Sequence, residues 1–276
     1  MLKYIFLVLS FITIGYAQNK AYSEVSVEFK NDVFFGGDDK DYTSGFEVSY
    51  TPSNKAYKIY LGQDIYTSTY YNETYPSANQ HPYAGWLYLG LEKNIEIAND
   101  ITSIIRLDIG TVGDDSLAQD TVDMVHSLID AHKYYGWDTQ MEKNVAYILS
   151  GKVIYNYDLT SQININPYVS IQTGNIIQNY GLGVDLSIEL DNYFDIYTSI
   201  DIKHISKNYF LEGEAKNSLL TYRAIKEDTV KHFTFGIETK YVNDYKLILG
   251  IELFSKTYLY QQNNSKIGVI KLVKRF

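Results

Sequence analysis

Residues 180–190 read Tyr-Gly-Leu-Gly-Val-Asp-Leu-Ser-Ile-Glu-Leu, so apolar side chains alternate here with glycine or with polar side chains. Successive side chains of a β-strand point to opposite faces, whereas an amphipathic helix repeats its apolar residues every three or four positions. Leu182, Val184, Leu186 and Ile188 would therefore share one face. The stretch predicts a long strand with one apolar face.

The same alternation recurs along the chain after its N-terminus. The predicted strands cover residues 24–29, 45–50, 56–66, 87–92, 103–109, 145–158, 162–173, 180–190, 194–205, 230–241, 245–258 and 266–276. About twelve such segments, many of roughly nine to fourteen residues, have the length and period of tilted transmembrane strands. No later stretch approaches the ~20 apolar residues of a membrane-spanning helix, so only a closed barrel could place this chain in a membrane.

The connections between these segments fall into two classes that alternate along the chain. The tight turns are residues 52–54, 99–100, 159–161, 191–192 and 243–244. The other connections are mostly longer and cover residues 31–42, 68–82, 114–144, 174–179, 206–229 and 261–265. Short turns on one rim and long loops on the other are typical of outer-membrane barrels, whereas a soluble β-sandwich has no reason to sort its loops. We therefore predict an all-β fold, an antiparallel transmembrane β-barrel of about twelve strands with a short helix in one long extracellular loop.

Composition agrees with a barrel in the outer membrane of a Gram-negative bacterium. The 276 residues include 28 tyrosines, and tyrosine suits the aromatic girdles at a membrane–water boundary. The net charge of −9 argues against a nucleic-acid surface, and the absence of cysteine excludes disulfides and thiol chemistry. The side chains expected to form a polar, charge-paired lumen are Glu24, Glu28, Glu47, Arg106, Asp108, Asp185, Asp201 and Lys203.

The first 17 residues have the pattern of a secretory signal peptide. Lys3 precedes an apolar run over residues 4–14, and Gly15-Tyr16-Ala17 fits a small-x-small cleavage site. The predicted organisation is a signal peptide, residues 1–17, followed by one outer-membrane barrel domain, residues 18–276.

One long loop, residues 114–140, carries the strongest helix signal after the N-terminus. Ser116 and Gln119 have capping-box spacing, and Gly136 could close the helix. The apolar residues at helical spacing are Leu117, Val122, Val125, Leu128 and Ile129. On this helix His126 is the candidate general base, because imidazole suits proton transfer near neutral pH.

The other unusual clusters also lie at the long-loop rim. Asn31-Asp32 ends the first strand and residues 41–45 open the second, so Asp32 and Thr43 can face each other across the mouth of a hairpin. Each cluster alone also fits ordinary turn, cap or girdle chemistry. Their convergence on one rim favours a functional site there.

Five motifs in order resemble the outer-membrane lipid A 3′-O-deacylases. They are Asn31-Asp32, Asp41-Tyr42-Thr43-Ser44-Gly45, Pro82-Tyr83-Ala84-Gly85-Trp86, Val125-His126 and Gly136-Trp137-Asp138-Thr139-Gln140. The match runs from about Ser23 to Gln140, and beyond it only the strand pattern agrees.

The resemblance implies a twelve-stranded barrel with its active site between the wall and the loop helix, open to the outer leaflet. By this resemblance His126 activates water, Asp32 helps to bind Ca²⁺, and Asn31 and Thr43 support the metal or the oxyanion. It implies lipid A, or lipopolysaccharide, as the membrane-bound substrate of a monomeric carboxylic ester hydrolase. The side chains assigned to substrate binding are His81, Tyr83 and Trp137.

Some positions depart from the family pattern. His81 stands where a basic residue, usually arginine, precedes Pro-Tyr-Ala-Gly, and Val122 stands where a glutamine is expected. Asp130, Asp138 and Glu142 are the candidates to replace an acidic residue expected shortly after the histidine.

Two other functions remain open at this stage. A non-catalytic barrel, either a channel or a surface-binding protein, could keep the fold and some motifs. An outer-membrane phospholipase would need a serine nucleophile beside the histidine, and Ser116 and Ser127 are poor candidates.

Overall fold

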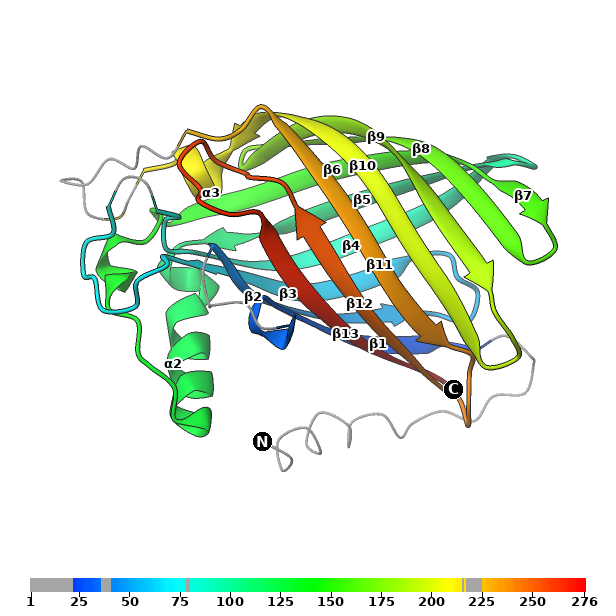
Figure 1. Ribbon diagram of the computed structural model, residues 1–276, viewed down its shortest axis with the longest axis horizontal. Coiled ribbons are helices and arrows are strands. Elements are labelled where there is room, and N and C mark those ends of the chain that lie inside the picture. The colour runs from blue at the N-terminus through cyan, green and yellow to red at the C-terminus, as the bar shows by residue number, and fades with distance from the viewer. Residues whose placement is uncertain (1–21, 36–40, 78–79, 215, 217–224) are drawn as a thin grey trace.

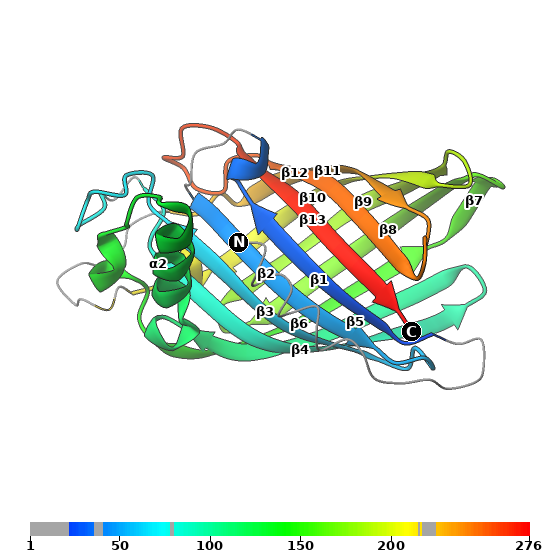
Figure 2. The ribbon, with the colours of Figure 1, turned by 90° about the horizontal axis from the view of Figure 1, so that it is seen from below.

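The chain folds into one closed antiparallel β-barrel (Figures 1 and 2). The computed structural model describes residues 22–35, 41–77, 80–214, 216 and 225–276. The strands are β1 (Glu24–Asn31), β2 (Asp41–Thr51), β3 (Lys58–Thr67), β4 (Ala84–Ala98), β5 (Ile101–Val112), β6 (Asn144–Tyr155), β7 (Tyr157–Thr160), β8 (Ile163–Gly174), β9 (Ile177–Glu189), β10 (Phe194–Asn208), β11 (Thr229–Thr239), β12 (Tyr245–Phe254) and β13 (Ser265–Arg275). The predicted signal peptide, residues 1–17, lies outside the described residues.

The thirteen strand labels correspond to a twelve-stranded barrel, because β6 and β7 are two parts of one strand that is interrupted at Asn156. Both pair with β8, and together they occupy the segment predicted as a single strand, residues 145–158. β1 pairs with β2 on one side and with β13 on the other, which closes the sheet. Closure removes the free edges that an open sheet would expose. The predicted fold class is confirmed.

The two rims differ as the sequence predicted, although several connections differ in length from the predicted ones. The loops that carry the helices gather at one end of the barrel, and tight turns occupy much of the other (Figure 1). The connection predicted over residues 174–179 was too long, because β8 and β9 extend until only residues 175–176 separate them. Within the described part of the chain, no helix is long and apolar enough to cross a membrane.

The outward faces of the strands form an exposed apolar belt. Leu89 on β4 is 62% exposed and Leu182 on β9 is 64% exposed. Other exposed leucine and isoleucine side chains recur at alternate positions of most strands. Such a continuous apolar surface belongs against lipid hydrocarbon, as in transmembrane barrels.

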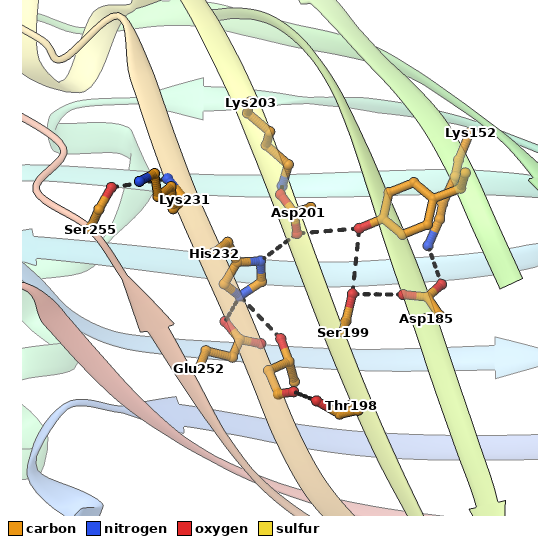
Figure 3. A network of polar contacts seen from close by, with 12 residues as sticks. Lys152, Asp185, Thr198, Ser199, Asp201, Lys203, Lys231, His232, Glu252 and Ser255 are labelled. Atoms are coloured by element: carbon orange, nitrogen blue, oxygen red, sulfur yellow. Dashed lines mark hydrogen bonds and ion pairs between the residues drawn. The ribbon is translucent and has the colours of Figure 1, made fainter. Parts of the chain in front are cut away.

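The inward faces carry the predicted charge-paired lumen (Figure 3). Lys152 Nζ lies 2.7 Å from Asp185 Oδ2, and His232 Nδ1 lies 2.9 Å from Asp201 Oδ2. Other ion pairs of the lumen are Arg106–Glu47, Arg106–Asp108, Lys203–Asp201, Lys271–Glu28 and Lys30–Glu252. A cavity of about 600 Å³ remains between these side chains. Pairing of opposite charges makes a polar interior tolerable inside a membrane.

An aromatic stack lies at the outer end of this cavity. The short helix α3 (Tyr209–Glu212) places Phe210, which is almost fully buried, with its ring centroid 4.9 Å from that of Tyr66. Tyr66 in turn stacks on His81 at 5.0 Å, and Trp86 lies 6.4 Å from Phe210. These rings narrow the route from the lumen to the outside.

Candidate active site

The β5–β6 loop, residues 113–143, forms a structure that we call the lid. It contains η3 (Asp114–Ser116), α2 (Ala118–Ile129) and η4 (Gly136–Thr139). Figure 1 shows α2 outside the barrel wall at the long-loop end, with its axis across that of the barrel. The predicted loop helix is therefore present, but it is shorter than residues 114–140.

The predicted caps of this helix were wrong. Leu117, in the left-handed region at φ 58°, precedes the first helical residue, and no side chain caps the helix there. Ser116 instead donates its Oγ hydrogen to the carbonyl of Gly113 at 2.5 Å within η3. Asp130 ends the helix at φ 57°, and Gly136 lies beyond it in η4. Two non-glycine residues at positive φ override the capping pattern because packing against the wall fixes where the helix begins.

The face of α2 that is turned inward also differs from the predicted one. Ala118, Val122 and His126 are buried, and their spacing of four residues places them in one stripe. A Cβ atom on Gly85 of β4 would lie 2.2 Å from the Cβ atom of Ala118, so the helix approaches the wall where side chains are smallest. Of the five residues predicted to form the apolar face, only Val122 is buried; Leu117, Val125, Leu128 and Ile129 are exposed.

A small apolar core fixes the lid to the wall. Its members are Ile65, Tyr83, Ala118, Val122, Tyr134 and Trp137. The Tyr83 ring lies 5.0 Å from that of Trp137 and 6.1 Å from that of Tyr134, both edge-to-face. Tyr83 and Trp137, predicted to bind substrate, are fully or almost fully buried here. In this arrangement they hold the lid, and burial raises the pKa of the Tyr83 hydroxyl.

His126 is oriented by the segment of the lid that follows α2. Its Nδ1 atom contacts the main-chain oxygen of His132, and its ring lies 5.5 Å from that of Tyr134. A carbonyl oxygen can only accept a hydrogen bond, so Nδ1 must carry the proton. In the neutral ring Nε2 then has the lone pair, which is the form required of a general base.

The acidic residues that the sequence offered as replacements for the family's acidic residue after the histidine are all exposed. Asp130, Asp138 and Glu142 lie at the surface of the lid, and the Nδ1 contact is made by a main-chain oxygen instead. Sequence reasoning could not find this partner, because every residue has a carbonyl group.

Tyr71, in the β3–β4 loop, holds the segment that carries this oxygen. Its ring stacks on that of His132, with centroids 4.3 Å apart and planes 3° apart, and its carbonyl accepts from the Tyr135 amide at 3.0 Å. The sequence analysis missed Tyr71. A tyrosine in a polar loop gives no signal that distinguishes a contact with another loop from ordinary exposure.

One row of residues across the wall connects the lid to the first strand. Asn31 pairs with Ser44, Ser44 with Ile65, and Ile65 with Gly85. Directly opposed residues of antiparallel strands point to the same face, and Gly85 lies under Ala118. Asn31 therefore belongs to the outer face on which α2 rests. At ~4.8 Å between strands it lies about 14 Å from Gly85, a span comparable to the ~18 Å length of α2.

The three residues predicted to lie together, Asn31, Asp32 and Thr43, are found where β1 ends and β2 begins. Asn31 Oδ1 accepts from the Val33 amide at 2.7 Å, and Asp32 is buried. Thr43 occupies a bulge and its Oγ lies 2.6 Å from that of Thr67. The pairing of Asn31 with Ser44 puts Asp32 and Thr43 at adjacent positions of the hairpin mouth, as predicted.

Asp32 also lines a polar pocket of about 330 Å³ at the outer rim. The carboxylates Asp41 and Glu73 and the amide Gln261 line it too, whereas His126 is not among its lining residues. Asp41 is already engaged, because it accepts from the Tyr258 hydroxyl at 2.7 Å and from Gln261 Nε2 at 3.2 Å. The structure thus places Asp32 at a hydrophilic corner of the wall and His126 under the lid.

This corner fits calcium in the chemistry of its donors. Ca²⁺ prefers carboxylate, amide, hydroxyl and carbonyl oxygens, and Asp32, Asn31 and Thr43 offer the first three. Among the described residues no group of three histidine, cysteine, aspartate or glutamate side chains could hold a metal ion. An ion here would therefore depend on main-chain, water or substrate oxygens to complete its shell.

His81 lies in the β3–β4 loop, where it is buried rather than exposed to solvent. It is 4% exposed, its ring lies between those of Tyr66 and Tyr258, and Nδ1 is 2.8 Å from the Pro82 oxygen. Burial lowers the pKa of His81, although Asp41 opposes the shift. A neutral imidazole at neutral pH offers a phosphate no charge, and in this structure His81 contributes to the aromatic stack.

Comparisons with known proteins agree with this architecture. The family model described as Outer membrane protein LpxR matches residues 4–194. No curated protein matches the chain. The solved structure of LpxR from Salmonella typhimurium aligns with a TM-score of 0.82 at 19% identity, covering 92% of this chain and all of that one. The NanC porin (TM-score 0.47, 7% identity, 92% of this chain and 100% of that one) is much less similar.

Proposed function

The chain belongs to the LpxR family of outer-membrane lipid A 3′-O-deacylases, and from that premise we propose that it hydrolyses an ester-linked acyloxyacyl chain of lipid A with Ca²⁺ and a water activated by His126. The barrel lies in the outer membrane of a Gram-negative bacterium. The substrate of such an enzyme is a lipid of the outer leaflet.

The contact between His126 Nδ1 and the His132 main-chain oxygen is the observation that carries the proposal. The His132 carbonyl holds the Nδ1 proton, so Nε2 can take a proton from water as the water attacks the ester. The same carbonyl stabilises the imidazolium that results, because Nδ1–H remains a donor to it. His126 then returns the proton to the departing alkoxide, which leaves a free fatty acid and a hydroxyl group on the lipid.

Asp32, Asn31 and Thr43 would hold and orient the ion at the end of β1. Calcium bound there supplies a Lewis acid that polarises the ester carbonyl. Asn31 and Thr43 would also direct polar hydrogens toward the developing oxyanion, where preorganised donors stabilise the transition state most.

The outer-face position of Asn31 and of the lid supports a lipid substrate for the proposed site. The row from Asn31 to Gly85 continues the face that carries the apolar belt. An acyl chain could therefore reach the site from the leaflet without passing through the lumen.

Neither alternative from the sequence is favoured by a particular observation. Ser116 is buried with its hydroxyl bonded to Gly113, and Ser127 points to solvent, so neither forms a phospholipase-like pair with His126. A channel would require an open route past Phe210 and Tyr66.

Mass spectrometry of lipid A tests the proposal directly. Expression in a host that lacks such an enzyme should remove one acyloxyacyl group, and chelation of calcium in isolated membranes should prevent this. His126→Gln should lower the rate by ~10²–10⁴-fold, the usual contribution of a general base, and Asp32→Asn should also abolish turnover. His204→Gln, which changes a histidine on β10, is the matched control and should act like the unaltered protein.

Full activity of both His126→Gln and Asp32→Asn, in folded barrels, would refute the assignment. Release of acyl chains from phospholipid but not from lipid A would instead favour a phospholipase.

A further inference from the structure

α2 has three faces, and the third is apolar but does not pack in the lid core. One face, with Ala118 and Val122, packs inward. The second carries the polar residues Gln119, Asp120, Asp123 and Ser127. The third consists of Met124, Val125, Leu128 and Ile129, all exposed, and we call it the apolar strip.

The apolar strip is a continuous surface rather than scattered exposure. Met124 is 60% exposed and Leu128 is 54% exposed, and they are one helical turn apart. Val125 and Ile129 repeat the same spacing beside them. Contiguous apolar surface of this kind on an otherwise folded element marks an interaction site.

The position of α2 continues the lipid-facing belt of the barrel. Outward residues alternate along β4, so Leu91, Leu89 and Leu87 lead to Gly85, on which Ala118 rests. Gly85 is about 7 Å beyond Leu87 along the strand. The helix thus begins where an exposed apolar row ends, at the long-loop end of the barrel (Figure 1).

A second apolar protrusion lies at the same end of the barrel. The turn η2 (Val33–Phe35) follows Asp32 and leaves Val33 and Phe34 exposed. Figure 1 shows η2 and α2 on the same lower side of the barrel. Two separate loops therefore present apolar side chains to the surroundings next to the wall.

Charge argues for hydrocarbon as the occupant. The polar face of α2 has two aspartates and no lysine or arginine, so attraction to lipid phosphates cannot hold the helix at the membrane. Burial of the apolar strip in acyl chains supplies the missing driving force, at ~25 cal/mol per Å² of apolar surface removed from water.

We propose that α2 is an interfacial helix whose apolar strip is immersed in the acyl chains of the outer leaflet. The membrane, and not the protein alone, then completes the packing of the lid. Asp120 and Asp123 face the headgroup layer, and the stripe with His126 faces the wall.

Spin labels at single cysteines test this placement, because the chain has no cysteine of its own. Met124→Cys and Leu128→Cys probe the apolar strip, and Gln119→Cys and Ser127→Cys are matched controls on the polar face. The labelled barrels are reconstituted in phosphatidylethanolamine–phosphatidylglycerol vesicles, with and without lipopolysaccharide. Collision rates with oxygen, which partitions into hydrocarbon, are compared with those of a water-soluble nickel chelate.

Labels at 124 and 128 should collide several-fold more with oxygen than with the nickel chelate, and labels at 119 and 127 should show the reverse. Equal access of the chelate to all four positions would overturn the proposal. Dipolar broadening between labels at position 128 would also overturn it, because a second copy of the chain would then cover the strip. These readouts require no turnover, so they are independent of the proposed hydrolase activity.

Discussion

At the scale of single residues, histidines in this barrel do different things because their surroundings differ. His126 lies on the lid with Nδ1 on a carbonyl oxygen, an arrangement that suits the proton transfer proposed for Nε2. His81 lies in the β3–β4 loop against the rings of Tyr66 and Tyr258, and burial lowers its pKa. The sequence predicts that both histidines lie at the long-loop rim, but it does not show that their surroundings differ.

The buried His81 should make the barrel sensitive to acid. Its pKa is lower when folded than when unfolded, so the unfolded chain binds the extra proton first, and stability falls as pH drops below about 6.5 toward the folded pKa. His81→Phe keeps the aromatic stack and removes the titration. The apparent unfolding temperature, followed by heat-dependent gel mobility at about pH 7.5 and pH 5, should fall less for the variant.

The carboxylate that raises the pKa of His81 provides a check on this interpretation. Asp41 opposes the shift, so Asp41→Asn should increase the acid sensitivity of the otherwise unaltered barrel. Identical acid sensitivity of the unaltered protein and His81→Phe would show that other groups dominate.

At the scale of elements, the lid depends on a contact between two loops that are distant in sequence. The Tyr71 ring stacks on His132, whose carbonyl orients His126. In the proposed mechanism Tyr71 would therefore act on His126 through the 131–135 segment and not by touching substrate.

Tyr71→Ala should lower kcat about tenfold with little change in KM, because the His126 ring would lose its fixed orientation while the binding surface stays. Tyr71→Phe keeps the stacking ring and should restore activity. Steady-state kinetics of lipid A turnover would measure both. A Tyr71→Phe variant as impaired as Tyr71→Ala would show that the hydroxyl group, rather than stacking, matters.

The strands could be predicted from the sequence and the lid helix only in part. Alternation as clear as that around Leu182 and Val184 has one structural meaning, so the barrel and its polar lumen followed from it. An apolar helix face on a membrane protein can pack against the protein or face the lipid, and helical periodicity does not distinguish the two. Leu128 and Val122 are equally apolar, and nothing in the pattern tells which faces the wall and which faces outward. Contacts such as Tyr71 with His132 arise only once the loops meet.

At the scale of the whole molecule, the barrel carries ion pairs in its interior and the lid on its outer face. The lumen retains a cavity of about 600 Å³, but Phe210 and Tyr66 stack at its outer end. Its charges, including Arg106 with Glu47, are bound to one another rather than arranged along an open path.

The unaltered barrel should therefore conduct ions poorly in planar lipid bilayers. Phe210→Ala removes the ring that stacks on Tyr66 and should raise the frequency and size of conductance steps. Leu89→Ala, a truncation on the lipid-facing side of β4, is the control and should leave conductance unchanged. Large, steady conductance of the unaltered protein would instead support a channel.

The seam between β1 and β13 has a consequence for assembly. Val25 pairs with Lys274 and Asn31 with Gly268, so the cylinder is shut by the chain segments that are farthest apart along the polypeptide. Pairing of segments so distant in sequence has the largest cost in loop-closure entropy. We therefore expect β1 and β13 to pair last during folding. Removal of the Glu28–Lys271 ion pair should slow closure of the barrel, so that envelope proteases degrade more of the incompletely folded chain. The molecules that complete folding should keep their full activity.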